Sequence, residues 1–168
     1  MSTRCAAAAS LLGQDHAVLG RNLQDHALIR LDEVDGPALR DAVARAAGAA
    51  GGADVVFAGR VLHHAAVPAK AVRALASLVR PGGALVVLEY DAHDDARMRE
   101  EQADVWLGFS PAELLALARE AGLDGATVEA LPGGLRGDGP DRHLSWHVLR
   151  ARRPVTTTGD RASDRPVS

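Results

Sequence analysis

The sequence predicts an α/β fold, in which helices cover the strands of a doubly wound sheet. The first observation is a strand, helix, strand unit, with a buried-type strand at residues 54–58, an amphipathic helix at 68–79 and a second apolar strand at 84–90. The second observation is that residues 84–88 are apolar at every position, which is typical of a strand covered by helices on both faces. Parallel pairing follows, because a helical crossover joins parallel neighbours.

The composition favours one small-molecule-binding domain. At 168 residues the chain is long enough for a single domain with its own core. Hydrophobic residues make up 47% and aromatic residues only 3%, so the core must be built mainly from Ala, Val and Leu. The formal net charge of -3 provides no basic field to attract nucleic acid or an anionic membrane, which makes a small molecule the expected partner.

The sequence is typical of a soluble protein. No stretch approaches the roughly 20 apolar residues that span a bilayer. The alanine-rich run at residues 5–12 ends at polar residues, so we interpret it as helix and not as a signal peptide. Cys5 is the single cysteine, which excludes an internal disulfide or a cysteine-based zinc cluster and fits a cytoplasmic location.

Residues 1–52 predict an atypical N-terminal segment made of a helix, a short strand and a second helix. The apolar spacing in residues 2–26 is helical. Residues 28–34 alternate like a short strand without a single apolar face, which suits a sheet edge. Pro37 then opens the second helix, because proline is tolerated where the backbone amide has no partner.

After the second apolar strand, the sequence predicts two helices and two further strands. Residues 95–105 carry the dense charge of a solvated helix, and Ser-Pro-Ala-Glu at 110–113 is a complete capping box for the next helix. The strand candidates are residues 126–131 and 143–151. The last segment, residues 154–168, has nothing to bury and is expected to be disordered.

Three motifs resemble the class I S-adenosylmethionine-dependent methyltransferases. Asp-Val-Val at 54–56 and Val-Leu-His-His at 61–64 resemble that family's fourth strand and the loop after it. Leu-Val-Arg-Pro-Gly-Gly-Ala-Leu at 78–85 resembles its helix end and fifth strand. The resemblance implies that residues 53–153 form the C-terminal half of the domain, a partial Rossmann-like doubly wound sheet that lacks the first two strands.

A further segment is similar to methyltransferases that are often fused to ArsR-type regulators. The matching residues are Ala-His-Asp-Asp at 92–95, Met-Arg-Glu-Glu at 98–101 and Asp-Val-Trp-Leu-Gly-Phe-Ser at 104–110. The likeness concerns the enzyme domain of those proteins. No helix-turn-helix pattern is visible in the sequence, and the acidic balance argues against DNA binding.

The resemblance implies S-adenosylmethionine as cofactor. Ligands of doubly wound sheets bind beyond the carboxyl ends of the strands, so the resemblance places Ala58, Gly59 and Arg60 at the cofactor's amino acid end. Small residues allow close backbone approach there, although an ordinary tight loop has the same composition. The resemblance places Asp35 where the family often has an acidic or small residue near the adenine, and Asp35 would equally serve to open a helix.

The front of the family's domain is not recognisable in the sequence. The acidic residue before a Gly-x-Gly loop and the second-strand carboxylate are missing, and Gly13 and Gly20 lie too far apart to form that loop. In the family's strand order, 3-2-1-4-5-7-6, residues 54–58 would then either pair with residues 28–34 or form an exposed apolar edge. We therefore expect a truncated domain, or one that a second copy or a partner chain completes.

Histidines are the candidate catalytic groups. His64 and His93 are expected near the carboxyl ends of the central strands, where either could act as general base, although hydrogen-bonded loop histidines are the simpler interpretation. No metal site is expected, since the resemblance explains the pair at 63 and 64. His143 and His147 would lie about 13 Å apart on one solvent-facing side of a strand.

Two functions of different kinds fit these observations. The first is a small-molecule methyltransferase. The second is a catalytically inactive methyltransferase-like module that serves as an interaction or regulatory subunit, with the charged residues 95–101 as its surface.

Overall fold

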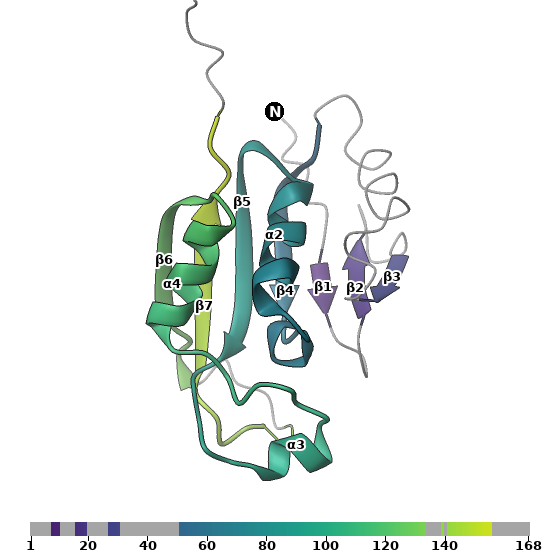
Figure 1. Cartoon of the computed structure of the whole chain (residues 1–168), viewed down its shortest axis with the longest axis vertical. Coiled ribbons are helices and arrows are strands. Elements are labelled where there is room, and N and C mark those ends of the chain that lie inside the picture. The colour runs from purple at the N-terminus through teal and green to yellow at the C-terminus, as the bar shows by residue number, and fades with distance from the viewer. Residues whose placement is uncertain are drawn as a thin grey trace, which may run out of the picture.

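The computed structural model describes residues 51–133, 139 and 141–155, together with the backbone of three strands that precede them. The main sheet has five strands in the order β1-β4-β5-β7-β6, and a separate sheet pairs β2 with β3 (Figure 1). The strands are β1 (Ala8–Ser10), β2 (His16–Leu19), β3 (Ala27–Arg30), β4 (Ala53–Gly59), β5 (Val79–Tyr90), β6 (Asp124–Ala130) and β7 (Trp146–Arg152).

The first three strands of the main sheet run parallel. β4 pairs in parallel with both β1 and β5, so that Ser10, Gly59 and Leu88 lie side by side. β7 then runs antiparallel between β5 and β6. The carboxyl ends of β1, β4 and β5 therefore meet at one edge of the sheet, which is where ligands bind in doubly wound folds.

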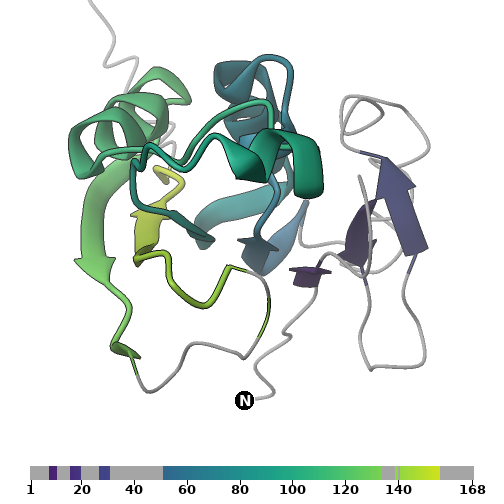
Figure 2. The same ribbon diagram turned by 90° about the horizontal axis from the view of Figure 1, so that it is seen from below.

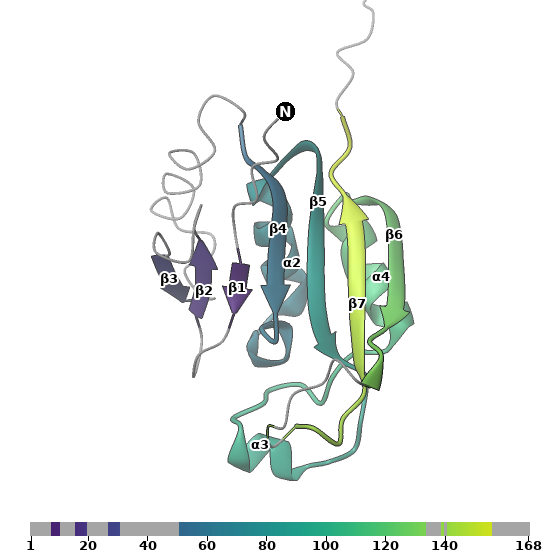
Figure 3. The same ribbon diagram turned by 180° about the vertical axis from the view of Figure 1, so that it is seen from behind.

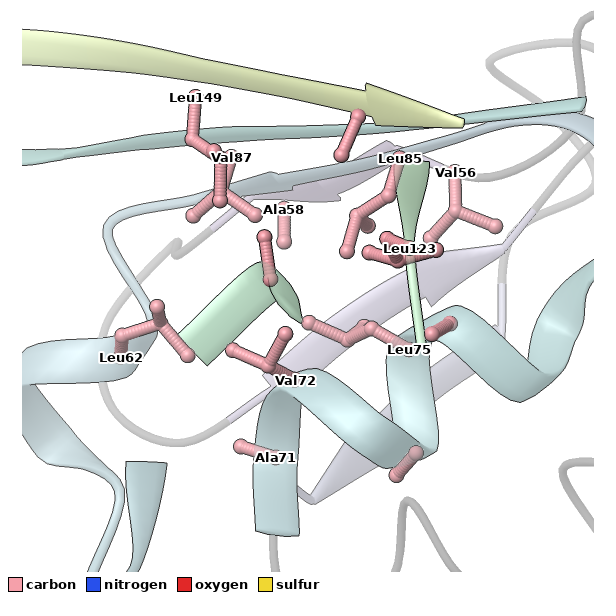
Figure 4. Close-up of a cluster of buried hydrophobic side chains, with 14 of the residues drawn as sticks. Val56, Ala58, Leu62, Ala71, Val72, Leu75, Leu85, Val87, Leu123 and Leu149 are labelled. Atoms are coloured by element: carbon pink, nitrogen blue, oxygen red, sulfur yellow. The ribbon is translucent and has the colours of Figure 1, made fainter. Parts of the chain in front are cut away.

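Two helices, α2 (Pro68–Leu78) and α4 (Pro111–Glu120), cover one face of the sheet. Both lie on the same side of β4, β5, β7 and β6, as the views from below and from behind show (Figures 2 and 3). No helix in the described part of the chain is long and apolar enough to cross a membrane. Figure 4 shows the aliphatic core between helices and strands, which includes Val56, Ala58, Leu62, Val72, Leu75, Leu85, Val87, Leu123 and Leu149.

The Pro-Gly-Gly motif forms the irregular entry into β5, directly after α2. Residues 80–83 stand out of the ladder between β4 and β5, where the register shifts. A Cβ atom on Gly83 would lie 2.8 Å from the carbonyl oxygen of Asp54, so a side chain at this position would collide with β4. The motif therefore acts as predicted, by turning the chain out of a helix and into the neighbouring strand.

Local hydrogen bonds define both ends of α4. At its start the Ser110 side chain accepts a hydrogen bond from the Glu113 amide, and the Glu113 carboxylate accepts one from the Ser110 amide, which is the predicted capping box. At its end the Leu123 amide donates to the Ala118 carbonyl, and Gly122 has a φ of 72°. This Schellman geometry directs Leu123 back into the core.

Ser110→Ala is expected to lower the free energy of unfolding by about 1 kcal/mol, because it leaves the Glu113 amide without its side-chain acceptor. The Ser110 amide and hydroxyl also lower the pKa of Glu113. A lowered folded-state pKa contributes stability above the unfolded-state value of about 4.3, and this contribution disappears as the pH falls through the folded value. In urea unfolding, the difference between wild type and variant should therefore shrink in acid, whereas the exposed Ser77→Ala should show no such dependence.

The expectations for the N-terminal segment need correction. Residues 2–26 are not one helix, because β1 and β2 lie within them. The strand expected at 28–34 is present as β3, but it pairs antiparallel with β2 and not with residues 54–58. Those residues do not form the expected exposed edge either, since β1 pairs with residues 57–59 of β4. The helix expected after Pro37 lies outside the described residues.

The C-terminal elements match the predictions with shifted bounds, and the strand expected at 126–131 is β6, two residues earlier at its start. The charged segment at 95–105 contains only α3 (Arg97–Glu101), and Ala103 shortly after it has a φ of 57°. The last strand begins at Trp146, so His143 lies in the turn before it. The tail from residue 156 onward lies outside the described residues.

Candidate functional site

The buried polar groups in the described part of the chain lie near the carboxyl ends of β4 and β5. The short 3-10 helix η3 (Leu62–His64) follows β4, and α3 with its flanking loops lies beyond the arrowheads of both strands (Figure 1). The buried polar or charged residues are His63, Glu89, Asp104, Asp141 and His147.

Glu89, near the end of β5, is a fully buried carboxylate. It accepts hydrogen bonds from the amides of Leu62 and Tyr90, both at 2.9 Å, and from the His63 amide at 3.3 Å. Its second contact with His63 joins Oε1 to Nδ1 at 2.5 Å. Because an ionised carboxylate only accepts, Nδ1 carries the proton of this bond and Nε2 points the other way, toward Asp104.

Arg60 lies on the other side of this edge, directly after β4. Its φ is 62°, and its amide donates to the Leu88 carbonyl at 2.9 Å. Its guanidinium lies 2.9 Å from Asp141, 3.1 Å from the Tyr90 hydroxyl and 5.4 Å from the Trp146 ring centre. Burial raises the pKa of Tyr90, which keeps its hydroxyl protonated to donate to Asp141 at 3.0 Å.

Asp104 follows α3, and its side chain is fully buried. Oδ1 lies 3.7 Å from Nε2 of His63 and 3.8 Å from Nδ1 of His64, and neither carboxylate oxygen has a hydrogen-bond partner. Burial raises the pKa of Asp104, while the two imidazoles lower it. The residue before it, Ala103, has a φ of 57°, which is strained for alanine.

Backbone contacts hold the Asp104 loop against η3. The amides of Val105 and Trp106 both donate to the His63 carbonyl at 2.9 Å. The Trp106 indole N–H donates to the Ala65 carbonyl at 2.8 Å. Asp104 is therefore positioned by its neighbours in the chain and needs no hydrogen bond of its own to stay in place.

The structure brings three of the four predicted cofactor residues to this edge. Ala58 is 0% exposed and belongs to the hydrophobic core, and Gly59 is buried between β1 and β5. Arg60 borders the same edge, but its guanidinium is engaged by Asp141 and Tyr90. Asp35 lies outside the described residues.

The two histidines proposed as general bases differ in their surroundings. Nδ1 of His93 accepts a hydrogen bond from the Asp95 amide at 3.3 Å, so the neutral ring carries its proton on the buried Nε2, which has no partner. Burial lowers the pKa of His93, which favours this neutral ring. His93 would have to give up the Asp95 contact before accepting a proton. His64 lies on η3, with Nδ1 3.3 Å from the Ala103 carbonyl oxygen.

The buried carboxylates Glu89, Asp104 and Asp141 were not predicted from the sequence. A signal existed for Glu89, because it is a charged residue that directly follows the uninterrupted apolar run 84–88. Asp104 and Asp141 lie in loops, where acidic residues are ordinary and carry no local signal. The expectation that His147 faces solvent was wrong, since it is only 8% exposed.

Proteins that bind nucleotide-like cofactors share this architecture. Parallel strands end at one edge of a sheet, small residues follow one of those strands, and helices pack on the sheet. The model of a methyltransferase domain family matches residues 13–129 of the chain. The chain therefore belongs to that family. The match begins inside the segment that the sequence analysis interpreted as atypical, and it includes β2, β3, β4 and β5.

Solved structures with a similar arrangement come mainly from methyltransferases. A candidate methyltransferase from Bacillus halodurans has 14% identity and a TM-score of 0.44, over 62% of this chain and 66% of that one. Haemonchus contortus phosphoethanolamine N-methyltransferase 2, bound to S-adenosyl-L-methionine, has 12% identity and a TM-score of 0.47, over 61% and 33%. An O-methyltransferase family protein from Burkholderia thailandensis has 20% identity and a TM-score of 0.44, over 71% and 42%.

The chain thus spans between a third and two thirds of the length of these proteins. No curated protein matches the sequence.

Proposed function

We propose that this chain is an S-adenosylmethionine-dependent methyltransferase that acts on a small molecule. The observation that carries the proposal is the match of residues 13–129 to a methyltransferase domain family. The parallel strand ends of β1, β4 and β5 support it, because they form the edge at which such sheets bind their ligands.

In this proposal the loop after β4 borders the amino acid end of the cofactor. Ala58 and Gly59 supply little side chain, so the backbone can approach a ligand closely. Arg60 shapes the same loop, since its φ of 62° turns the chain and its guanidinium ties the loop to Asp141 and Tyr90. Methyl transfer from a sulfonium needs mainly in-line placement of the acceptor, which a rigid loop provides.

The proposal extends to the kind of methyltransferase. The motifs within residues 92–110 support a domain similar to those fused to ArsR-type regulators. The acidic charge balance supports a small-molecule substrate and no contact to nucleic acid or membrane, and the single cysteine fits a cytoplasmic location. The absence of a Gly-x-Gly motif from the front of the sequence supports a cofactor site that a second copy or a partner chain completes.

Calorimetric titration with S-adenosylmethionine and S-adenosylhomocysteine tests the proposal, with the solution mass determined on the same sample. We expect saturable binding with a Kd in the micromolar range, which corresponds to a binding free energy of about -8 kcal/mol. A folded protein that binds neither compound would contradict the proposal for this chain. That result would favour the inactive interaction module.

Arg60→Ala is expected to raise the Kd for S-adenosylhomocysteine by about tenfold, roughly 1.4 kcal/mol, because the loop after β4 loses its tie to Asp141 and Tyr90. Arg80→Ala is the matched control. Arg80 pairs with Asp54 at 2.5 Å, at the opposite end of β4. Calorimetry should show an unchanged Kd for the control, and equal effects of both substitutions would show that Arg60 does not shape the cofactor site.

A further inference from the structure

His63, His64 and Asp104 lie together at the end of β4. Each offers one ligand atom, and the three atoms lie within 4.8 Å of one another. Oδ1 of Asp104 is 3.7 Å from Nε2 of His63 and 3.8 Å from Nδ1 of His64. Ligand atoms around a tetrahedral zinc ion, each about 2.0–2.2 Å from the metal, are separated by roughly 3.3–3.6 Å. The two distances from Asp104 are therefore within a few tenths of an ångström of the spacing that one ion requires.

The Asp104 carboxylate points to a ligand independently of this spacing. Its side chain is 0% exposed, and neither oxygen has a hydrogen-bond partner. The distances to the two imidazoles exceed the range of direct hydrogen bonds, about 2.7–3.2 Å. A buried carboxylate without partners is costly, and coordination of a cation removes that cost.

Glu89 orients His63 in the way that a carboxylate hydrogen-bonded to a metal-binding histidine does in metal sites. Its Oε1 lies 2.5 Å from Nδ1 of His63 and holds the proton there. Nε2 is then the nitrogen without a proton, and it is the one that faces Asp104. A carboxylate that bonds the distal N–H of a ligating histidine fixes both tautomer and ring orientation.

A protonated His63 between Glu89 and Asp104 is the competing explanation. It would bring an N–H of the ring into hydrogen-bond contact with each carboxylate, but the Asp104 contact is 3.7 Å. It would also leave the second oxygen of Asp104 unpaired and give His64 no part in the cluster. A shared cation explains the approach of both imidazoles to the same oxygen.

We propose that His63 Nε2, His64 Nδ1 and Asp104 bind one divalent transition metal ion, with Glu89 as the outer carboxylate. Two imidazoles and a carboxylate suit Zn²⁺, whose preferred ligands are nitrogen, sulfur and carboxylate oxygen. The ion takes the place of the His64 Nδ1 proton, whose contact with the Ala103 carbonyl is long at 3.3 Å. In this role His64 is a ligand and not a general base. The proposal is independent of the proposed methyltransferase activity.

The test measures Zn²⁺ binding by full-length protein without a histidine tag, after treatment with a chelator. We expect about one equivalent of Zn²⁺ by elemental analysis after gel filtration, and a thermal midpoint about 5–10 °C higher with excess Zn²⁺. Co²⁺ substitution should give visible absorption bands of a site with nitrogen ligands. Failure to retain Zn²⁺ would overturn the proposal.

Asp104→Asn and His64→Gln should each weaken Zn²⁺ binding by at least about tenfold and abolish the midpoint shift. In chelator, Asp104→Asn should be no less stable than wild type, because it removes an unpaired buried carboxylate. His143→Gln is the matched control, since His143 also contacts a carboxylate, Asp95, at 2.9 Å. Zn²⁺ binding by His64→Gln equal to that of wild type would overturn the proposal, even if Asp104→Asn failed to fold.

Discussion

Glu89→Ala is expected to lower the free energy of unfolding by about 3–5 kcal/mol. The substitution removes the acceptor of the Leu62 and Tyr90 amides and of His63 Nδ1, all within 3.0 Å of the carboxylate. These donors stay buried when the carboxylate is gone, so each loses a hydrogen bond without gaining water. Urea unfolding monitored by circular dichroism measures the loss.

Two further variants distinguish the loss of these buried hydrogen bonds from the loss of a negative charge alone. Glu129→Ala removes an exposed carboxylate that pairs with Arg150 on the neighbouring strand, and it should cost less than about 1 kcal/mol. Glu89→Gln keeps the shape of the side chain but places an amide NH₂ against hydrogen-bond donors. Its loss of unfolding free energy should therefore lie between those of Glu89→Ala and Glu129→Ala. If Glu89→Ala cost no more than Glu129→Ala, the buried network would not be what joins η3 to β5.

The strand, helix, strand unit was predictable because its signals are local. The apolar run 84–88, the Pro-Gly-Gly turn and the capping box at Ser110 each depend on residues that are close in sequence. The structure confirms the turn, the capping box and the parallel pairing of the apolar run with β4. Helices were expected on both faces of this strand, but the described helices cover only one face, and Ala84, Val86 and Leu88 are half-buried. The core is built mainly from the Ala, Val and Leu side chains that the composition demanded. The family resemblance noticed in these motifs is likewise confirmed at the level of the methyltransferase domain.

The candidate site was only partly predictable because its contacts join distant segments. His63 meets Glu89 across 26 residues, and Tyr90 meets Asp141 across 51. No periodicity reports such a pair, since each partner alone is an ordinary loop or strand-end residue. The same reason explains the error at the front of the sheet, where β1 is a three-residue strand whose alanine-rich sequence equally suits a helix.

Gly108→Ala is expected to lower the free energy of unfolding by about 2–5 kcal/mol, from two separate causes. Gly108 has a φ of 73°, a left-handed conformation that costs about 1–2 kcal/mol for any residue with a Cβ. The added Cβ would also lie 2.2 Å from the Asp91 carbonyl oxygen and 3.0 Å from that of Tyr90, and overpacking of this kind adds about 1–3 kcal/mol. Urea titration with an unchanged m value provides the measurement.

Gly122→Ala measures the cost of the left-handed backbone conformation without a steric clash. Gly122 has nearly the same φ, 72°, but a Cβ there would meet no atom within 4 Å, so this variant should lose only about 1–2 kcal/mol. The difference between the two variants then measures how tightly the loop after β5 closes, through the Phe109 amide on the Tyr90 carbonyl and the His93 amide on the Leu107 carbonyl. Similar losses for both variants would mean that this loop yields easily.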